Sequence, residues 1–493
     1  MERAARRFVL PLLAATAVAH GTHLFRYFVR DETVALHKVA GWTFLDILGR
    51  SRLFFSGSLG ERPHVLGYAF VKLLWALFGP WFPGYAATMI AVHLSLTTLV
   101  LVLGVRLAPE TPRVGALAAF AFGVGGASAD IGDFAIVQHV SLGVCAVLLA
   151  LSYLGYRRRP TLRRAALVLF WAFVATLTQE SGPVATLTPV VLEASLAIGP
   201  AALRPPRGAS IRALLGVCGL SIALSLPRLA HEATALLVRS EALDAAAAER
   251  YTITFSPVHV LDNVAHLVTR IAFVPPAFAL PFVLFLLSGA LSPGLRAVTV
   301  FGMAEGLLLA LPYATIEYTA PFYAYSASPF LGLALGAAVA ALAERGPPSR
   351  EGAFSRWAGM CALVSLWVLA AARIRARDAA DAHAFATLRS IRAGLRAALP
   401  AGPAPVSLEL HGLPTGRIHP DYPFMLADFL PVFVPGRSFS AVWVRDPRLD
   451  EPLEIDFVTY SAKRPVALDV NSRRFEIVED RLVSCTVGRC TGD

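Results

Sequence analysis

Long apolar runs separated by short arginine-rich segments constrain the fold of this chain more than any other feature of its sequence. The runs are about 16–25 residues long, enough for an α-helix to cross the ~30 Å hydrocarbon core of a bilayer. The strict alternation of an outer-membrane β-barrel is absent. The sequence therefore predicts an all-α polytopic membrane domain with about eleven transmembrane helices.

The composition agrees with a membrane protein. Hydrophobic residues make up 56% of the chain and charged residues 16%, whereas soluble domains average about a quarter charged residues. The net charge of +10 would suggest nucleic acid binding in a soluble protein, but the arginines gather in loops between apolar runs. Zinc-ligand spacing, a phosphate loop and basic–aromatic interleaving are all absent, so no nucleic-acid partner is expected.

The arginine clusters also predict an orientation. Basic loops face the cytoplasm, and the densest cluster is Arg157, Arg158, Arg159, Arg163 and Arg164. This rule places the N-terminus inside and the C-terminal tail outside. The predicted spans are Phe8–Val29, Gly84–Val105, Val114–Ala127, His139–Tyr156, Ala165–Thr178, Pro183–Ile198, Ala213–Leu226, Pro276–Leu291, Ala297–Pro312, Ser328–Leu342 and Trp357–Ala372. Richness in alanine and arginine, without a retention signal, favours the inner (cytoplasmic) membrane of a bacterium.

The chain is expected to have two domains, a membrane domain over residues 1–373 and an extracytoplasmic α+β domain over residues 374–493. Val65–Phe78, between the first two spans, has the apolar spacing of an amphipathic helix on the membrane face. The tail begins with a second amphipathic stretch, Ala384–Leu399. Short alternating runs follow it and predict strands: Val406–Leu410, Ala441–Val444, Leu453–Val458 and Phe475–Val478.

Acidic residues recur in the predicted outer loops. The four loops concerned carry Asp31 with Glu32, Asp130 with Asp133, Glu180, and Glu317. Acids avoid hydrocarbon and collect in loops in any membrane protein. Their shared membrane level, with little other charge around them, nevertheless favours a site on the outer face.

Polar residues inside the predicted spans leave two interpretations open. His20, His23 and Arg26 lie on one side of the first span, at i, i+3 and i+6. They either hold an anion near the outer surface or form a packed polar seam. Glu305 lies within the ninth span, where an unpaired charge costs roughly 2.5–3.5 kcal/mol, so it must face other helices. A structural hydrogen bond and a catalytic role both fit it.

Several short motifs follow one another along residues 1–340 and together resemble a known family. They are Arg30-Asp31-Glu32, Glu61-Arg62-Pro63, Leu77-Phe78-Gly79, Ile90-Ala91-Val92-His93, Ser128-Ala129-Asp130-Ile131, Thr178-Gln179-Glu180-Ser181 and Tyr323-Ala324-Tyr325-Ser326-Ala327-Ser328-Pro329. Their order resembles the polyprenyl-phosphate-sugar-dependent glycosyltransferases of the C-type fold. The likeness is greatest to bacterial relatives of the transmembrane and tetratricopeptide-repeat O-mannosyltransferases.

The resemblance implies transfer of a sugar from a polyprenyl-phosphate donor to a protein or glycan acceptor hydroxyl, with inversion. It assigns the general base to Asp31, with Glu32 and Asp130 as second choices, because a positioned carboxylate can take the proton of the attacking hydroxyl. Arginine and lysine suit the phosphate leaving group. The candidates for the donor are Arg30, Lys38, Arg62, Glu180, Tyr323 and Tyr325.

No cofactor is required by this scheme. Some relatives in the family use a divalent metal, but no residues here have convincing ligand spacing. A transporter or flippase for a lipid-linked sugar is the rival class, although transporters place their sites near the midplane. An inactive membrane scaffold is a third interpretation, because Glu61 and Ala129 depart from the family pattern.

Cys485 and Cys490 lie near the C-terminus in the sequence Cys-Thr-Val-Gly-Arg-Cys. The predicted outer location of the tail allows a disulfide to persist, and Gly488 can adopt the positive φ that a tight loop requires. A metal pair and two free thiols are the alternatives. A disulfide here would close a short loop and stabilise the fold by only ~2 kcal/mol.

Overall fold

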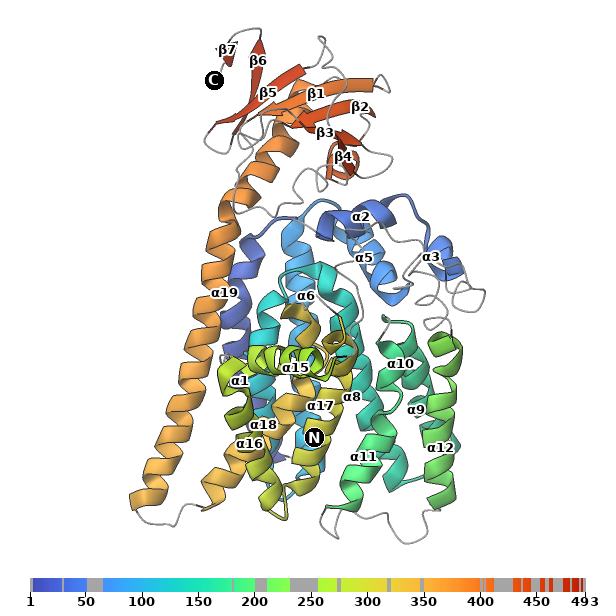
Figure 1. Ribbon diagram of the computed structural model, residues 1–493, viewed down its shortest axis with the longest axis vertical. Coiled ribbons are helices and arrows are strands. Elements are labelled where there is room, and N and C mark those ends of the chain that lie inside the picture. The colour runs from blue at the N-terminus through green and yellow to red at the C-terminus, as the bar shows by residue number, and fades with distance from the viewer. Residues whose placement is uncertain are drawn as a thin grey trace.

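The computed structural model shows a helical bundle topped by a β-sheet (Figure 1). It describes residues 3–28, 31–50, 65–179, 181–199, 211–230, 256–272, 276–316, 321–345, 350–399, 402, 405–411, 429–435, 438–444, 453–456, 461–463, 473–478, 481–486 and 489–490. The helices have the apolar composition of a multi-pass membrane protein, as the sequence predicts. The long helix α19 (Arg350–Ala398) runs along one side of the bundle up to the sheet.

Five helices among the described residues are long and apolar enough to cross a membrane. They span Arg6–Phe25, Phe82–Leu107, Val137–Arg158, Arg212–Ala230 and Arg296–Ala314. Shorter apolar helices lie at Val65–Phe78, Arg113–Gly123, Gly182–Ala197, Ala279–Leu291 and Ser328–Glu344. The total of about eleven spans stays a prediction.

Most of the helical elements of the bundle overlap predicted spans, whereas Phe134–Ile136, Pro257–Ala272 and Pro321–Ala324 lie between predicted spans. The elements are α1 (Arg3–His20), η1 (Gly21–Phe25), α6 (Phe82–Leu107), α7 (Arg113–Gly123), η2 (Gly126–Asp130), η3 (Phe134–Ile136), α8 (Val137–Arg158), α9 (Leu162–Thr176), α10 (Gly182–Ala185), α11 (Thr188–Ala197), α12 (Ile211–Ala223), α15 (Pro257–Ala272), η5 (Pro276–Phe278), α16 (Ala279–Ser288), η6 (Gly289–Leu291), α17 (Arg296–Ala314), η7 (Pro321–Ala324) and α18 (Ser328–Arg345).

Two of the predicted elements differ in the structure. The predicted span Pro183–Ile198 is divided into α10 and α11, and Pro189 stands in the first turn of α11, where its missing N–H costs no helical hydrogen bond. The last predicted span and the amphipathic stretch Ala384–Leu399 form one continuous helix, α19. The proposed domain boundary at residue 373 therefore falls inside a helix.

Glycine allows the bundle helices to approach closely. A Cβ added to Gly104 on α6 would lie 2.6 Å from the Cα of Gly115 on α7. A Cβ added to Gly302 on α17 would lie 2.6 Å from the carbonyl oxygen of Phe330 on α18. Small residues at such crossings give membrane helices the van der Waals contact that drives their association.

Short helices cover the end of the bundle that faces the sheet. They are α2 (Asp31–Ala40), α3 (Phe44–Arg50) and α5 (Val65–Phe78), and Figure 1 shows them between the bundle and the sheet. The bounds of α5 are those predicted from its apolar spacing. The Lys72 ammonium donates hydrogen bonds to the carbonyl oxygens of Val39 (2.9 Å) and Ala40 (3.2 Å) at the end of α2. These bonds join α2 and α5 into one outer layer.

The tail contains a seven-stranded sheet with the order β4-β3-β2-β1-β5-β6-β7. Its central strand β1 is parallel to β2 and β5, and the outer pairs are antiparallel. Each of the four runs predicted as strands falls largely within a strand. The strands are β1 (Pro405–His411), β2 (Ser438–Val444), β3 (Leu453–Asp456), β4 (Ser461–Lys463), β5 (Arg473–Val478), β6 (Arg481–Thr486) and β7 (Arg489–Cys490).

The tail and the bundle share one apolar core. Leu388, Ile391 and Leu395 on α19 are buried, as the amphipathic spacing predicts, together with Leu408 and Leu410 of β1. The described segment 429–435 contacts the same end of the bundle through Phe433, whose ring packs against those of Tyr27, Phe28 and Trp75. The sheet is therefore held to the bundle both by α19 and by this aromatic contact.

Candidate functional site

Two of the four predicted acidic loops meet around the segment that joins α7 to α8. Glu32, in the first turn of α2, is fully buried, and its Oε1 accepts a hydrogen bond from the backbone N–H of Phe134 at 3.1 Å. Asp130 lies at the end of η2, four residues before Phe134. The structure thus brings Glu32 and the Asp130 loop together, although about 100 residues separate them in sequence.

Asp130 is held by a cation from the far end of the chain. It is 4% exposed and forms an ion pair with Arg377 of α19. The next residue on α19, Asp378, contacts His23 and Arg26 at the end of the first span. Two adjacent residues of α19 therefore fix both η1 and η2. The sequence gives no sign of this pairing, because the partners are more than 240 residues apart.

The polar residues of the first span form a packed seam, one of the two alternatives left open by their spacing. The anion beside them is the chain's own: His23 Nδ1 lies 3.1 Å from Asp378 Oδ2, and Arg26 Nε lies 3.6 Å from Oδ1. The His20 ring donates from Nε2 to the carbonyl oxygen of Gly123 at 3.1 Å. Burial raises the pKa of Asp378, but the hydrogen bond and charge of His23 and the charge of Arg26 outweigh this and lower it overall.

The predicted tyrosines lie on the other side of the same loop. The Tyr325 hydroxyl is 2.7 Å from His93 Nδ1, and His93 Nε2 is 3.0 Å from the carbonyl oxygen of Gly123. Because a carbonyl oxygen only accepts, Nε2 carries the proton and Nδ1 of the neutral ring accepts from Tyr325. Tyr323 stacks on Tyr313 with a centroid distance of 4.6 Å. Helix η7, which bears Tyr323, contacts η2 and is covered by α15.

The remaining candidates lie wholly or partly outside the described residues. Arg30, Arg62, Glu180 and Glu317 are not described, and for Asp31 and Lys38 only the backbone of α2 is. Glu305 is fully buried and accepts a hydrogen bond from the Thr188 hydroxyl. This contact fits the structural interpretation of Glu305. The described side chains include no group of three or more His, Cys, Asp or Glu that could hold a metal ion.

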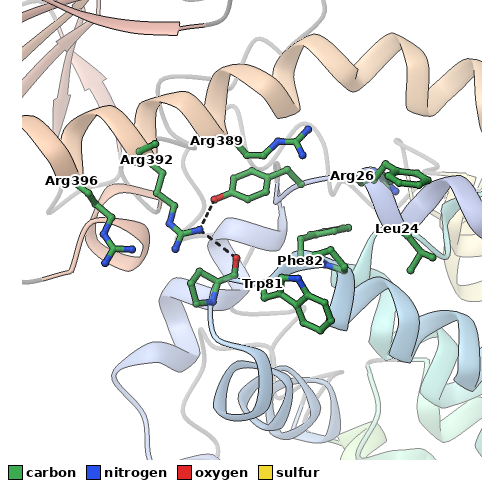
Figure 2. Close-up of a pocket in the computed structure, with 12 residues that line it drawn as sticks. Leu24, Arg26, Trp81, Phe82, Arg389, Arg392 and Arg396 are labelled. Atoms are coloured by element: carbon green, nitrogen blue, oxygen red, sulfur yellow. Dashed lines mark hydrogen bonds between the residues drawn. The ribbon is translucent and has the colours of Figure 1, made fainter.

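An arginine-rich pocket lies beside this cluster, between α19, the end of η1 and the turn that joins α5 to α6. Its volume is about 570 Å³, and we call it the arginine pocket. Figure 2 shows Arg389, Arg392 and Arg396 reaching into it from one face of α19. Arg392 Nη1 donates to the Tyr27 hydroxyl at 3.4 Å and to the carbonyl oxygen of Pro80 at 3.5 Å. These arginines follow the i, i+3, i+7 spacing of a helix face, the signal that could have identified them in the sequence.

Aromatic side chains separate the arginine pocket from Glu32. Phe28 packs edge-on against Phe82 at 5.1 Å, Tyr85 at 5.1 Å and Phe134 at 5.9 Å. Phe433 from the tail covers the same group at 4.8 Å from Phe28. Phe82 lines the pocket and the backbone N–H of Phe134 bonds Glu32, so the Phe28 ring packs between a wall of the pocket and the residue that bonds Glu32.

No protein-family model matches the chain, and no curated protein matches it in sequence. Three solved structures align with most of its length. ArnT from Cupriavidus metallidurans bound to undecaprenyl phosphate is 14% identical, with a TM-score of 0.44 over 86% of this chain and 84% of its own. The Archaeoglobus fulgidus oligosaccharyltransferase in complex with Zn and sulfate is 11% identical, with a TM-score of 0.47 over 87% of this chain and 62% of its own. The arabinofuranosyltransferase AftD from Mycobacteria is 14% identical, with a TM-score of 0.42 over 88% of this chain and 35% of its own. Two of these neighbours are named for sugar transfer, the oligosaccharyltransferase and the arabinofuranosyltransferase, and the third is a complex with undecaprenyl phosphate.

Proposed function

We propose that this chain is a membrane glycosyltransferase that moves a sugar from a polyprenyl-phosphate donor to an acceptor hydroxyl on the outer face of the inner membrane. The observation that carries the proposal is the hydrogen bond between Glu32 and the amide of Phe134. It ties the start of α2, and with it the backbone of Asp31, to the loop that carries Asp130. Acids from separate outer loops therefore share one place, as a site for an attacking hydroxyl requires.

Asp31 is the general base in this proposal. Asp130 is neutralised by Arg377, and Glu32 is buried with an oxygen committed to an amide. Both are better suited to positioning than to taking a proton. Asp31 adjoins Glu32 at the first residue of α2, where the family resemblance assigns the base. Asparagine at this position would keep the size of the side chain and remove its basicity.

The reaction is a single displacement at the anomeric carbon. The acceptor oxygen forms a bond to that carbon while its proton passes to Asp31. The bond from the anomeric carbon to the phosphate oxygen breaks, and polyprenyl phosphate leaves with the electron pair. Attack opposite the leaving group inverts the anomeric centre. Arg30, Lys38 and Arg62 are the proposed cations for the phosphate, and Glu180, Tyr323 and Tyr325 complete the proposed donor site.

Reconstitution of the full chain into liposomes tests the proposal against a transporter. The liposomes carry polyprenyl-phosphate mannose, and a serine- and threonine-containing peptide is the acceptor in a first panel of sugars and acceptors. A glycosyltransferase releases free polyprenyl phosphate in proportion to glycosylated product. Movement of intact donor across the bilayer, without release of the carrier under any acceptor of the panel, would contradict the proposal and support a flippase.

A further inference from the structure

The reaction proposed above assigns no role to the arginine pocket. Four of its lining residues are arginines, Arg26, Arg389, Arg392 and Arg396, and none is acidic. The carboxylate nearest to Arg26, Asp378, already contacts His23. The three arginines of α19 therefore bring their positive charge to the pocket without a carboxylate on its wall.

These arginines are available to an anion. Arg389 and Arg396 are exposed, and Arg392 is half-buried. Arg26 is 3% exposed, and its Nε and Nη1 have no hydrogen-bond acceptor among the described residues. The ion pair with Asp378 therefore leaves part of the hydrogen-bonding capacity of this buried guanidinium unsatisfied, and an anionic ligand in the pocket it lines would be stabilised. Guanidinium groups bind phosphate oxygens through paired hydrogen bonds.

The rest of the pocket is mostly apolar and includes exposed aromatic side chains. Phe25 and Trp81 line it and are 77% and 58% exposed, as aromatic residues at a membrane interface are. Towards the N-terminus of α1, Val18 and Leu10 are exposed as well. A ligand with a phosphate among the arginines could lay its apolar chain along this track. The volume of about 570 Å³ also exceeds that of a phosphate group alone.

We propose that the arginine pocket binds the phosphate head group of an anionic phospholipid from the outer leaflet. Bound there, the lipid joins α19 to η1 and to the α5–α6 turn, and so fastens the tail to the bundle. The aromatic layer of Phe28, Phe82, Tyr85 and Phe134 keeps this lipid away from the carboxylates. The site is therefore a lipid-binding site separate from the proposed donor site, and it does not rest on the proposed function.

Native mass spectrometry of the full chain in a neutral detergent tests this site. Phosphatidylglycerol is added in one arm, phosphatidylcholine in a second, and inorganic phosphate in a third. We expect one retained phosphatidylglycerol per chain and no comparable retention of phosphatidylcholine. The R389Q/R396Q variant should bind phosphatidylglycerol at least about tenfold more weakly, because each arginine near a lipid phosphate contributes to the binding free energy. R375Q, an exposed arginine of the same helix outside the pocket, should bind as the parent does.

Arg389 and Arg396 are exposed, so their replacement should leave the fold intact, which the melting temperature of each variant checks. The single variant R396Q provides a milder second case, with an intermediate loss of binding. Equal retention of phosphatidylglycerol by R389Q/R396Q and R375Q would overturn the proposal. Equal retention of phosphatidylcholine, or a site filled by inorganic phosphate alone, would overturn it too. The experiment measures lipid binding and not sugar transfer, so a failure of the proposed glycosyltransferase function would leave its result unaffected.

Discussion

Gly132 lies against the two side chains that fix η1 to α19. A Cβ added there would lie 2.5 Å from the ring of His23 and 2.6 Å from Arg26 Nη1. Both side chains are buried, so neither can move freely aside. We expect Gly132→Ala to destabilise the folded protein by about 1–3 kcal/mol, the usual cost of overpacking, and to lower its melting temperature in detergent.

Gly216 provides the matched control for this substitution. It lies within α12, and a Cβ added there would meet no atom within 4 Å. Alanine in a helix is favoured over glycine by about 0.8–1 kcal/mol, so Gly216→Ala should leave the melting temperature unchanged or raise it. Equal melting temperatures for Gly132→Ala and Gly216→Ala would show that the packing around His23 is looser than described.

Asp378 gives the stability of the protein a dependence on acid pH. Its pKa is lowered in the folded state, so it stabilises the fold above the pKa of an unfolded aspartate, near 3.9. That contribution is lost as the pH falls through the lowered folded value. Asp378→Asn should therefore destabilise the protein at pH 7, by roughly 3 kcal/mol, because Arg26 then lacks its anion.

Thermal melts of the parent and of Asp378→Asn between pH 7 and pH 3 measure this effect. The gap between their melting temperatures should be constant from pH 7 to about pH 5 and should narrow below about pH 4. A gap that is the same at pH 3 as at pH 7 would show that the Asp378 charge does not stabilise the folded state.

The last two strands of the sheet contain Cys485 and Cys490. Strand β7 is antiparallel to β6, and the register places Cys485 opposite Cys490. Opposed residues in antiparallel strands have Cα atoms about 4.5–5.5 Å apart, within the range of about 4.4–6.8 Å that a disulfide spans. We predict that the two cysteines form a disulfide in the extracytoplasmic tail.

Mass spectrometry of the unreduced, alkylated protein tests the disulfide. The C-terminal peptide should carry no alkyl group before reduction and two after it. Cys361 is an internal control when the protein is alkylated under denaturing conditions, because its thiol is free. Alkylation of both tail cysteines before reduction would contradict the disulfide and weaken the outer placement of the tail.

Most of the elements could be predicted from apolar spacing, and the exceptions have physical causes. Helix α5 has the predicted bounds because its apolar face repeats at helical spacing. Helix α19 was expected as two helices because its charged middle, from Arg373 to Asp381, interrupts the apolar run. In the structure, part of that charge is satisfied by residues of η1 and η2, and the helix continues through it.

The candidate site could also be predicted only in part, because some of its contacts join residues that are distant in sequence. Glu32, Asp130 and the Tyr323–Tyr325 segment were identified because they follow predicted spans and match family motifs. Arg377 and Asp378 were not, because an ion pair between distant residues leaves no local pattern. The three α19 arginines of the arginine pocket lie on the polar side of an amphipathic stretch, which sequence alone does not distinguish from a solvated helix face.

For the whole molecule, the arginine clusters predict that the two ends of the chain lie on opposite sides of the membrane. Reporter fusions after Arg159 and after Gly402 test this prediction. The first point lies between α8 and α9, in the dense basic cluster, and the second follows α19. We expect a cytoplasmic signal at Arg159 and an extracytoplasmic signal at Gly402. Signals from the same side would contradict the topology and the outer location of the site.

The most direct measurement of the central claim is the rate of carrier release from polyprenyl-phosphate sugar by the Asp31→Asn variant. The proposed base would be lost while the shape of the residue stays the same, so the rate should fall at least about 100-fold, with the melting temperature unchanged. Asp262→Asn is the control, since Asp262 is an exposed acid on α15 whose one ion pair among the described residues is with His266 at 3.6 Å, and it should keep the parent rate. Carrier release by Asp31→Asn at the parent rate would contradict the assignment of the base and the mechanism built on it.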